Sequence, residues 1–270
     1  MSRRIFFCLQ LLLMAAIRAQ EPLPGRIEVR FLDARHLALV CIYDDFLRQR
    51  LHESYGKHLK KVSSDPRCDY WSKESQYTIS LAKVIAQYRP LISKTLQQYE
   101  KYTIRGNRIL SGGYWLNSTR QSRVPDMVTG KPWPTANADV AHFVFLTLAK
   151  PLNAGQEYLL TMPTGSQLTI KHQGDNTLSY LYKFNQLGFA PQAARKYAYI
   201  GCWQGDAEEL DITKHLNKPF YIRKTDGDEI VFTGTVQVRD KEAIWDEINL
   251  KFTGEQVAQL DCSAFNQPGE

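Results

Sequence analysis

The residues that could carry chemistry are scattered along this sequence rather than grouped. The six histidines are His36, His52, His58, His142, His172 and His215. The sequence has no Gly-x-Ser-x-Gly motif to present a nucleophilic serine, so it does not predict a Ser-His-Asp hydrolase. It also has no Cys and His spacing typical of a zinc site. The sequence therefore predicts no catalytic residue, no metal ligand and no cofactor.

Clustered carboxylates near residue 210 are the best candidate for a cation site. They are Asp206, Glu208, Glu209 and Asp211. Calcium favours carboxylate oxygens, but this spacing does not fit an EF-hand loop. Because acidic side chains usually face solvent, a solvated loop is the favoured interpretation.

Aromatic side chains offer a different chemistry, since an exposed ring can stack on a sugar. The five tryptophans are Trp71, Trp115, Trp133, Trp203 and Trp245. Trp115 and Trp133 lie in or beside expected loops, so they are the candidates for sugar stacking. Burial in a core or at a domain interface is the alternative, and it is favoured because large aromatic residues usually fill cores.

The N-terminus predicts export. Arg3 and Arg4 precede an apolar run over residues 5–17, and Ala19 marks a cleavage point, so residues 1–19 are expected to be a signal peptide. The run is too short for a stable anchor, and no later segment is apolar enough to span a membrane. We therefore expect a secreted or periplasmic protein.

Removal of residues 1–19 lowers the formal net charge from +6 to +3, because Arg18 leaves with Arg3 and Arg4. The remaining Lys and Arg are mixed with acids and form no basic patch, so the charge pattern does not favour a nucleic-acid partner.

Four cysteines remain after the predicted cleavage, and two fall in each expected domain. They are Cys41, Cys68, Cys202 and Cys262. An oxidising compartment would permit disulfides among them, and four cysteines allow three connectivities. Four thiols without a bond are an equally weighted alternative, since unpaired cysteines are often buried.

The first expected domain, residues 20–178, reads as a β-sandwich. Residues 26–43 predict a hairpin with its turn near Asp33, and residues 142–148 alternate strongly. Residues 157–162 are expected to pair with that strand. Further strands are expected at 77–85, 94–102, 109–117 and 168–171, a long loop at 118–138, and either a short helix or an irregular insertion at 45–59. Pro90 is expected to interrupt whatever element contains it.

The second expected domain, residues 179–270, begins with strand, sharp corner, strand. Alternating residues from Tyr180 to Phe184 and from Tyr197 to Cys202 predict the strands. Gly188 and Pro191 supply the bend between them. Residues 220–223 and 230–239 predict a hairpin around Asp226-Gly227. Short strands with frequent turns throughout predict an all-β chain of two sandwich domains in tandem.

The motifs of this second domain resemble those of the immunoglobulin-like domain that precedes the catalytic barrel of family-nine glycoside hydrolases (cellulases and endoglucanases). They are Phe184-Asn185-Gln186-Leu187-Gly188-Phe189-Ala190-Pro191, then Lys196 with its apolar strand, then 219–223 with 230–236, then Leu260-Asp261-Cys262-Ser263-Ala264-Phe265 with Pro268-Gly269. The resemblance implies structural roles for Asn185, Gln186, Gly188, Phe189 and Pro191.

The resemblance also implies what this chain does. The family's Asp-Ala-Gly-Asp motif does not occur, and the strands expected after Pro268-Gly269 do not follow, so the second domain is expected to be incomplete at its C-terminus. Gly174-Asp175 and Gly205-Asp206 read as turns. We expect the non-catalytic front of an exported glycoside hydrolase, whose partner is a polysaccharide held by a catalytic domain outside this chain. The alternative is a stand-alone secreted β-sandwich that binds carbohydrate or a cell surface.

Overall fold

The computed structural model describes residues 22–118, 140–185, 187–225, 227, 229–239 and 256–268. The predicted signal peptide at 1–19 and all of the predicted loop 118–138 except Ser118 lie outside these residues, and so do Trp133, Gln186, Trp245 and Gly269.

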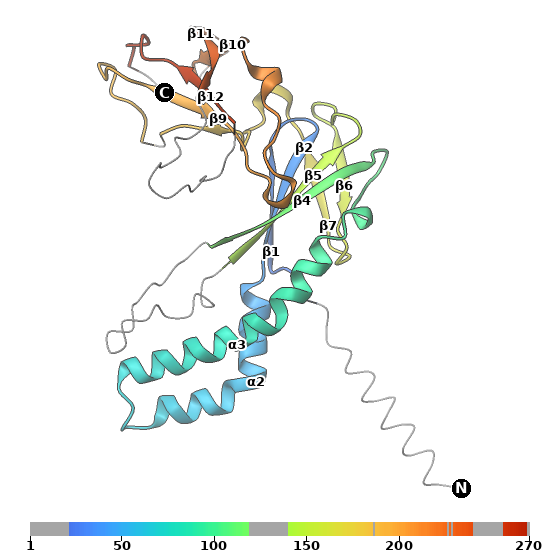
Figure 1. The fold of residues 1–270 in the computed structure, drawn as a ribbon, viewed down its shortest axis with the longest axis vertical. Coiled ribbons are helices and arrows are strands. Elements are labelled where there is room, and N and C mark those ends of the chain that lie inside the picture. The colour runs from blue at the N-terminus through green and yellow to red at the C-terminus, as the bar shows by residue number, and fades with distance from the viewer. Residues whose placement is uncertain are drawn as a thin grey trace, which may run out of the picture.

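Strands provide most of the regular elements of the described chain. They are β1 (Arg26–Phe31), β2 (His36–Ile42), β3 (Thr103–Ile104), β4 (Ile109–Ser118), β5 (Val140–Leu148), β6 (Glu157–Thr161), β7 (Gln167–Lys171), β8 (Tyr182–Lys183), β9 (Tyr197–Ile200), β10 (Pro219–Arg223), β11 (Ile230–Arg239) and β12 (Val257–Asp261). The helices are α2 (Asp44–Ser64) and α3 (Tyr70–Leu96), with short 3-10 turns η1 (Tyr99–Lys101), η3 (Gly174–Asn176), η4 (Gly205–Ala207) and η5 (Thr213–His215). Figure 1 shows their arrangement.

A central four-stranded sheet of order β1-β2-β5-β4 carries a hydrophobic core on each face. On β2, Leu37 and Leu39 enter one core, whereas Ala38 and Val40 enter the other. The partner strand β5 divides in the same way, as its alternation predicted. Because side chains alternate along a strand, β2, β4 and β5 each supply both cores.

The first core is closed by the three-stranded sheet β3-β6-β7 and by the two helices. Two sheets sharing one core make the predicted sandwich. The predicted pairing of 157–162 with 142–148 is wrong, because β6 pairs with β3 and β7, while β5 pairs with β2 and β4. The segment between β5 and β6 crosses from one sheet to the other instead of closing a hairpin.

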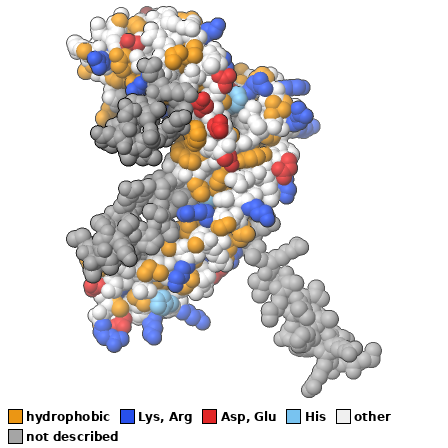
Figure 2. All heavy atoms as spheres, viewed as in Figure 1, with side chains coloured by type: hydrophobic (Ala, Val, Ile, Leu, Met, Phe, Trp, Pro, Cys, Tyr) orange, Lys and Arg blue, Asp and Glu red, His pale blue; other side chains and the backbone are white. Residues whose placement is uncertain are grey.

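The two helices α2 and α3 correct the strands predicted at 77–85 and 94–102. Residues 77–85 lie wholly in α3, whereas 94–102 contains the end of α3 and the turn η1. The helix α2 resolves the choice left open at 45–59 in favour of a helix. Val84, Ile92 and Leu96 are buried at helical spacing, which outweighs the local β-propensity of this segment. Pro90 lies inside α3 without ending it. Lys and Arg side chains gather at the far end of the pair (Figure 2).

The second core joins the other face of the central sheet to the C-terminal sheet, whose order is β10-β11-β12-β9-β8. Its members from the C-terminal part include Ile200, Ile212 and Leu260, which pack with Phe143 and Phe145 of β5. The predicted hairpin β10–β11 is confirmed, and the strands predicted on the two sides of the corner, β8 and β9, pair with each other. The domain boundary at residues 178 and 179 stays a prediction. No helix among the described residues is long and apolar enough to cross a membrane.

Candidate functional site

The corner between β8 and β9 is shaped by the side chain of Asn185. Its Oδ1 accepts a hydrogen bond from the Leu187 backbone N–H at 3.1 Å, and its Nδ2 donates to the Gly188 carbonyl at 2.8 Å. Gly188 has a φ of +77°, a conformation that favours glycine. Asparagine commonly stabilises such turns through its own backbone contacts. The residue types at these positions therefore dictate the corner.

Lys196 fastens this corner to the end of the described chain. The residue is only 3% exposed, and its Nζ donates to Pro191 O at 2.9 Å, Ala193 O at 2.8 Å and Asn266 Oδ1 at 3.2 Å. Its backbone N–H also donates to Ser263 Oγ at 3.0 Å. A buried ammonium is tolerated when its donors are satisfied, so one side chain holds two segments about seventy residues apart.

The fastened corner presents apolar side chains to solvent. Leu187 is 97% exposed, Phe184 58% and Phe189 38%. Together they form an apolar surface, which we call the corner surface (Phe184, Leu187 and Phe189). Exposed apolar side chains grouped on one turn favour a contact with another protein surface.

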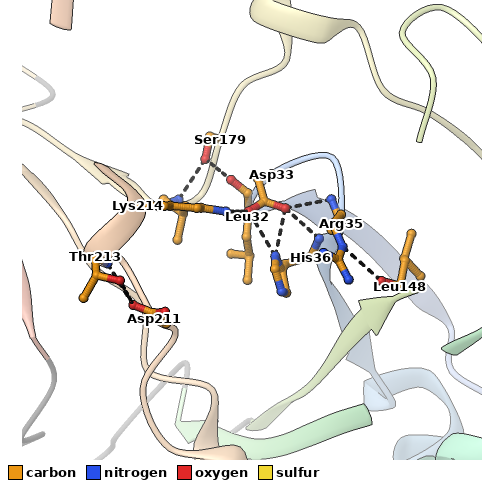
Figure 3. Close-up of polar contacts among 10 residues, drawn as sticks. Leu32, Asp33, Arg35, His36, Leu148, Ser179, Asp211, Thr213 and Lys214 are labelled. Carbon is orange, nitrogen blue, oxygen red and sulfur yellow. Dashed lines mark hydrogen bonds and ion pairs between the residues drawn. The ribbon is translucent and has the colours of Figure 1, made fainter. Parts of the chain in front are cut away.

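A polar junction links the turn between β1 and β2 to the C-terminal part (Figure 3). Lys214 Nζ donates to Asp33 Oδ2 at 2.5 Å, and Ser179 Oγ donates to Leu32 O at 2.6 Å. Asp33 Oδ1 also accepts from the backbone N–H groups of Arg35 and His36 at 2.7 and 2.9 Å. Burial alone would raise the pKa of Asp33, but the hydrogen bonds from His36 and Lys214 outweigh it and hold this pKa well below its usual value.

A second junction uses the turn Gly205-Asp206. Asp206 Oδ1 accepts a hydrogen bond from the Tyr114 backbone N–H of β4 at 2.6 Å. Gly205 has a φ of +70°, and a Cβ there would lie 2.0 Å from Tyr114 O. The turn therefore requires glycine in order to dock against β4.

Comparison with known proteins gives a match for the segment that contains the corner and Lys196. Residues 182–270, the last third of the chain, match the family model described as the cellulase N-terminal ig-like domain. The C-terminal part is therefore similar to an Ig-like domain of this kind, and we refer to it as the Ig-like domain. No curated protein and no solved structure matches the chain. The predicted resemblance is thus confirmed over the corner, the Lys196 contacts and the turn at 262–265.

In the acidic segment 206–211, the carboxylates of Asp206, Glu209 and Asp211 accept hydrogen bonds from different parts of the chain instead of converging on one point. Glu209 accepts from the Gln256 backbone N–H, and Asp211 Oδ1 accepts from the Thr213 N–H and hydroxyl at 2.9 and 2.6 Å. Among the residues that the structure describes, no group of three or more His, Cys, Asp or Glu side chains is placed to hold a metal ion.

The other predicted site residues lie apart from one another. Trp115 is half-buried, with its ring 5.4 Å from that of Phe143 in the second core. Cys41 lies in the first core and Cys202 in the second, while Cys262 Sγ donates to Lys196 O at 3.1 Å. Cys68 lies in the turn between the helices and, like Cys41, is a thiol.

One buried polar chain was missed by the sequence analysis. Ser93 Oγ and Tyr114 Oη are 2.7 Å apart, and Tyr114 Oη is 2.6 Å from His142 Nδ1. Burial, with a smaller effect of Arg89, lowers the pKa of His142 to about 4. The ring is therefore neutral near pH 7, and its Nδ1 shares a hydrogen bond with the tyrosine hydroxyl. The available signal was that Tyr114 and His142 are polar residues at strand positions that alternation assigns to the buried face.

Proposed function

We propose that this chain is the non-catalytic N-terminal portion of an exported glycoside hydrolase of the cellulase type, in which it braces a catalytic barrel. The observation that carries the proposal is the family match of residues 182–270, which identifies a cellulase-associated N-terminal domain. The predicted signal peptide at 1–19 supports export.

The corner surface supports the bracing role. Leu187 is almost fully exposed, and Phe184 is more than half exposed, so both would lose water contact in an interface. Burying one such side chain completely contributes roughly 1.5 to 3 kcal/mol. Asn185 and Lys196 already fix the corner, so little conformational entropy is lost on docking. A barrel seated here would gain several kcal/mol on this physical estimate.

The first experiment is to read the coding sequence after residue 270. We expect it to encode a helical barrel with an Asp-Ala-Gly-Asp motif. A continuation without either would contradict the proposal. N-terminal sequencing of the exported protein should give Gln20 as its first residue.

The second experiment measures bracing directly in the joined protein. Leu187→Ser and Phe184→Ser should lower the melting temperature of the barrel, measured by calorimetry, while the Ig-like domain keeps its own transition. Val238→Ser is the matched control, since Val238 is also exposed but lies on β11 away from the corner turn. An unchanged barrel transition in the corner variants would refute the bracing role.

A further inference from the structure

A cleft opens between the turn regions of the central sheet and the Ig-like domain. Its volume is about 1070 Å³. One wall comes from the β1–β2 turn and from residues 172–177, and the other comes from Tyr182 and from residues 215–225. Ligand sites prefer such boundaries between two units, and this volume lies at the upper end of their usual range.

Apolar groups form the base of the cleft, and two aromatic rings lie at its sides. Leu181, Ile200 and Leu260 of the second core reach its base. Tyr182 is 42% exposed and Tyr221 49% exposed, and both line the cleft. Tyrosine rings combine an apolar face with a hydroxyl, which suits a ligand with both apolar and hydroxyl-bearing faces.

Hydrogen-bonding groups also line the cleft. His172 is buried, and its Nδ1 accepts from the Gly174 N–H at 3.2 Å, which leaves Nε2 as the donor of the ring. Asp175 and Asn176 follow in the 3-10 turn η3 and also line the cleft. Across the cleft, His215 Nε2 is buried and has no hydrogen-bond partner in the described structure.

The charges of the lining are largely balanced. Lys214 neutralises Asp33 at one end, and Lys224 Nζ lies 2.6 Å from Glu229 Oε2 at the other. Lys218 and Arg223 add two positive charges to the lining, and Asp175 adds one negative charge. Because two of the charged groups in the lining are paired, its net charge is small, which favours an uncharged ligand rich in hydroxyl groups over a strongly anionic one.

We propose that this cleft binds a neutral oligosaccharide, with Tyr182 and Tyr221 contacting sugar faces and with His172, Asp175 and Asn176 bonding to sugar hydroxyls. This site uses neither Leu187 nor Phe184, so it does not rest on the bracing role.

The test uses the full chain and a set of soluble hexasaccharides. Cellohexaose, xylohexaose and mannohexaose are the neutral probes, and hexagalacturonate is the acidic probe, with binding measured by calorimetric titration. We expect at least one neutral probe to bind, and Tyr182→Ala and Tyr221→Ala each to weaken that binding at least tenfold. Trp71→Ala is the matched control, because Trp71 is 66% exposed on the distant helix α3.

Thermal melting of each variant separates loss of the site from loss of folding. Because Tyr182 and Tyr221 lie on different strands, one variant remains informative if the other unfolds. Absence of binding to all neutral probes would overturn the proposal. So would binding that survives in a folded tyrosine variant, binding that Trp71→Ala abolishes, or binding of hexagalacturonate alone.

Discussion

Replacing Asp33 by alanine separates two contributions to the junction in Figure 3. The carboxylate accepts from the backbone N–H groups of Arg35 and His36 within the turn, and from Lys214 across the junction. A hydrogen bond to a charged group contributes about 1.5 to 3 kcal/mol when it is shielded from water. Lys214 is half-exposed, so its ion pair should contribute only about 0.5 to 1 kcal/mol.

The turn bonds should therefore dominate. We expect Asp33→Ala to lower the free energy of unfolding by about 3 kcal/mol, and Lys214→Ala by no more than about 1 kcal/mol. Urea denaturation of the full chain, followed by circular dichroism, gives both values from the shift in midpoint. If Lys214→Ala costs as much as Asp33→Ala, the ion pair holds the junction and this reasoning is refuted.

The pH dependence of the same residue adds an independent check. The folded pKa of Asp33 lies below its usual value, so its contribution is complete above the unfolded pKa of about 3.9 and is lost as the pH falls further. Asp33→Asn keeps an acceptor oxygen but removes the charge. The stability gap between the natural protein and Asp33→Asn should narrow below about pH 4, and a gap that stays constant from neutral pH into that range would contradict the assignment.

Three further predictions concern Lys196, Gly205 and His142. Lys196→Met leaves two carbonyls and an amide oxygen unpaired, so it should cost about 3 kcal/mol in urea denaturation, against less than about 0.5 kcal/mol for Lys61→Met on the exposed face of α2. Gly205→Ala should cost more than about 3 kcal/mol because its Cβ would meet the β4 backbone, whereas Gly155→Ala, which has a similar φ but open space, should cost about 1 kcal/mol. Burial depresses the folded pKa of His142 to about 4, so stability should fall by about 3 kcal/mol as the pH drops from 6.5 toward 4, and His142→Gln should flatten this acid limb of the stability curve.

Alternation along the chain was sufficient to predict most strands. The hairpin 26–43, the strand 142–148 and the hairpin around Gly227 all form where the period of two predicted them. The corner at Asn185 and Gly188 was predictable too, because its geometry depends on residue types a few positions apart. Local chemistry fixes such features before any distant contact forms.

The helix α3 shows where local reading failed. Its residues have mixed propensities and contain Pro90, so short-range rules favoured strands. The helix is stabilised instead by burial of Val84, Ile92 and Leu96 against α2 and the central sheet. Most of the stability of a helix in a protein comes from packing its apolar face against other elements. Residue propensities do not include this packing, so they favoured the wrong structure for this segment.

The sequence by itself determined most of the strands, the corner motif and its resemblance to a known domain, because each depends on residues close together in the chain. Only the tertiary structure decided that the central sheet carries a core on both faces, that Asp33 meets Lys214, and that Tyr182 and Tyr221 share a cleft with His172. The physical reason is that these contacts join segments far apart in sequence, and a local pattern does not encode which distant partner covers an apolar face.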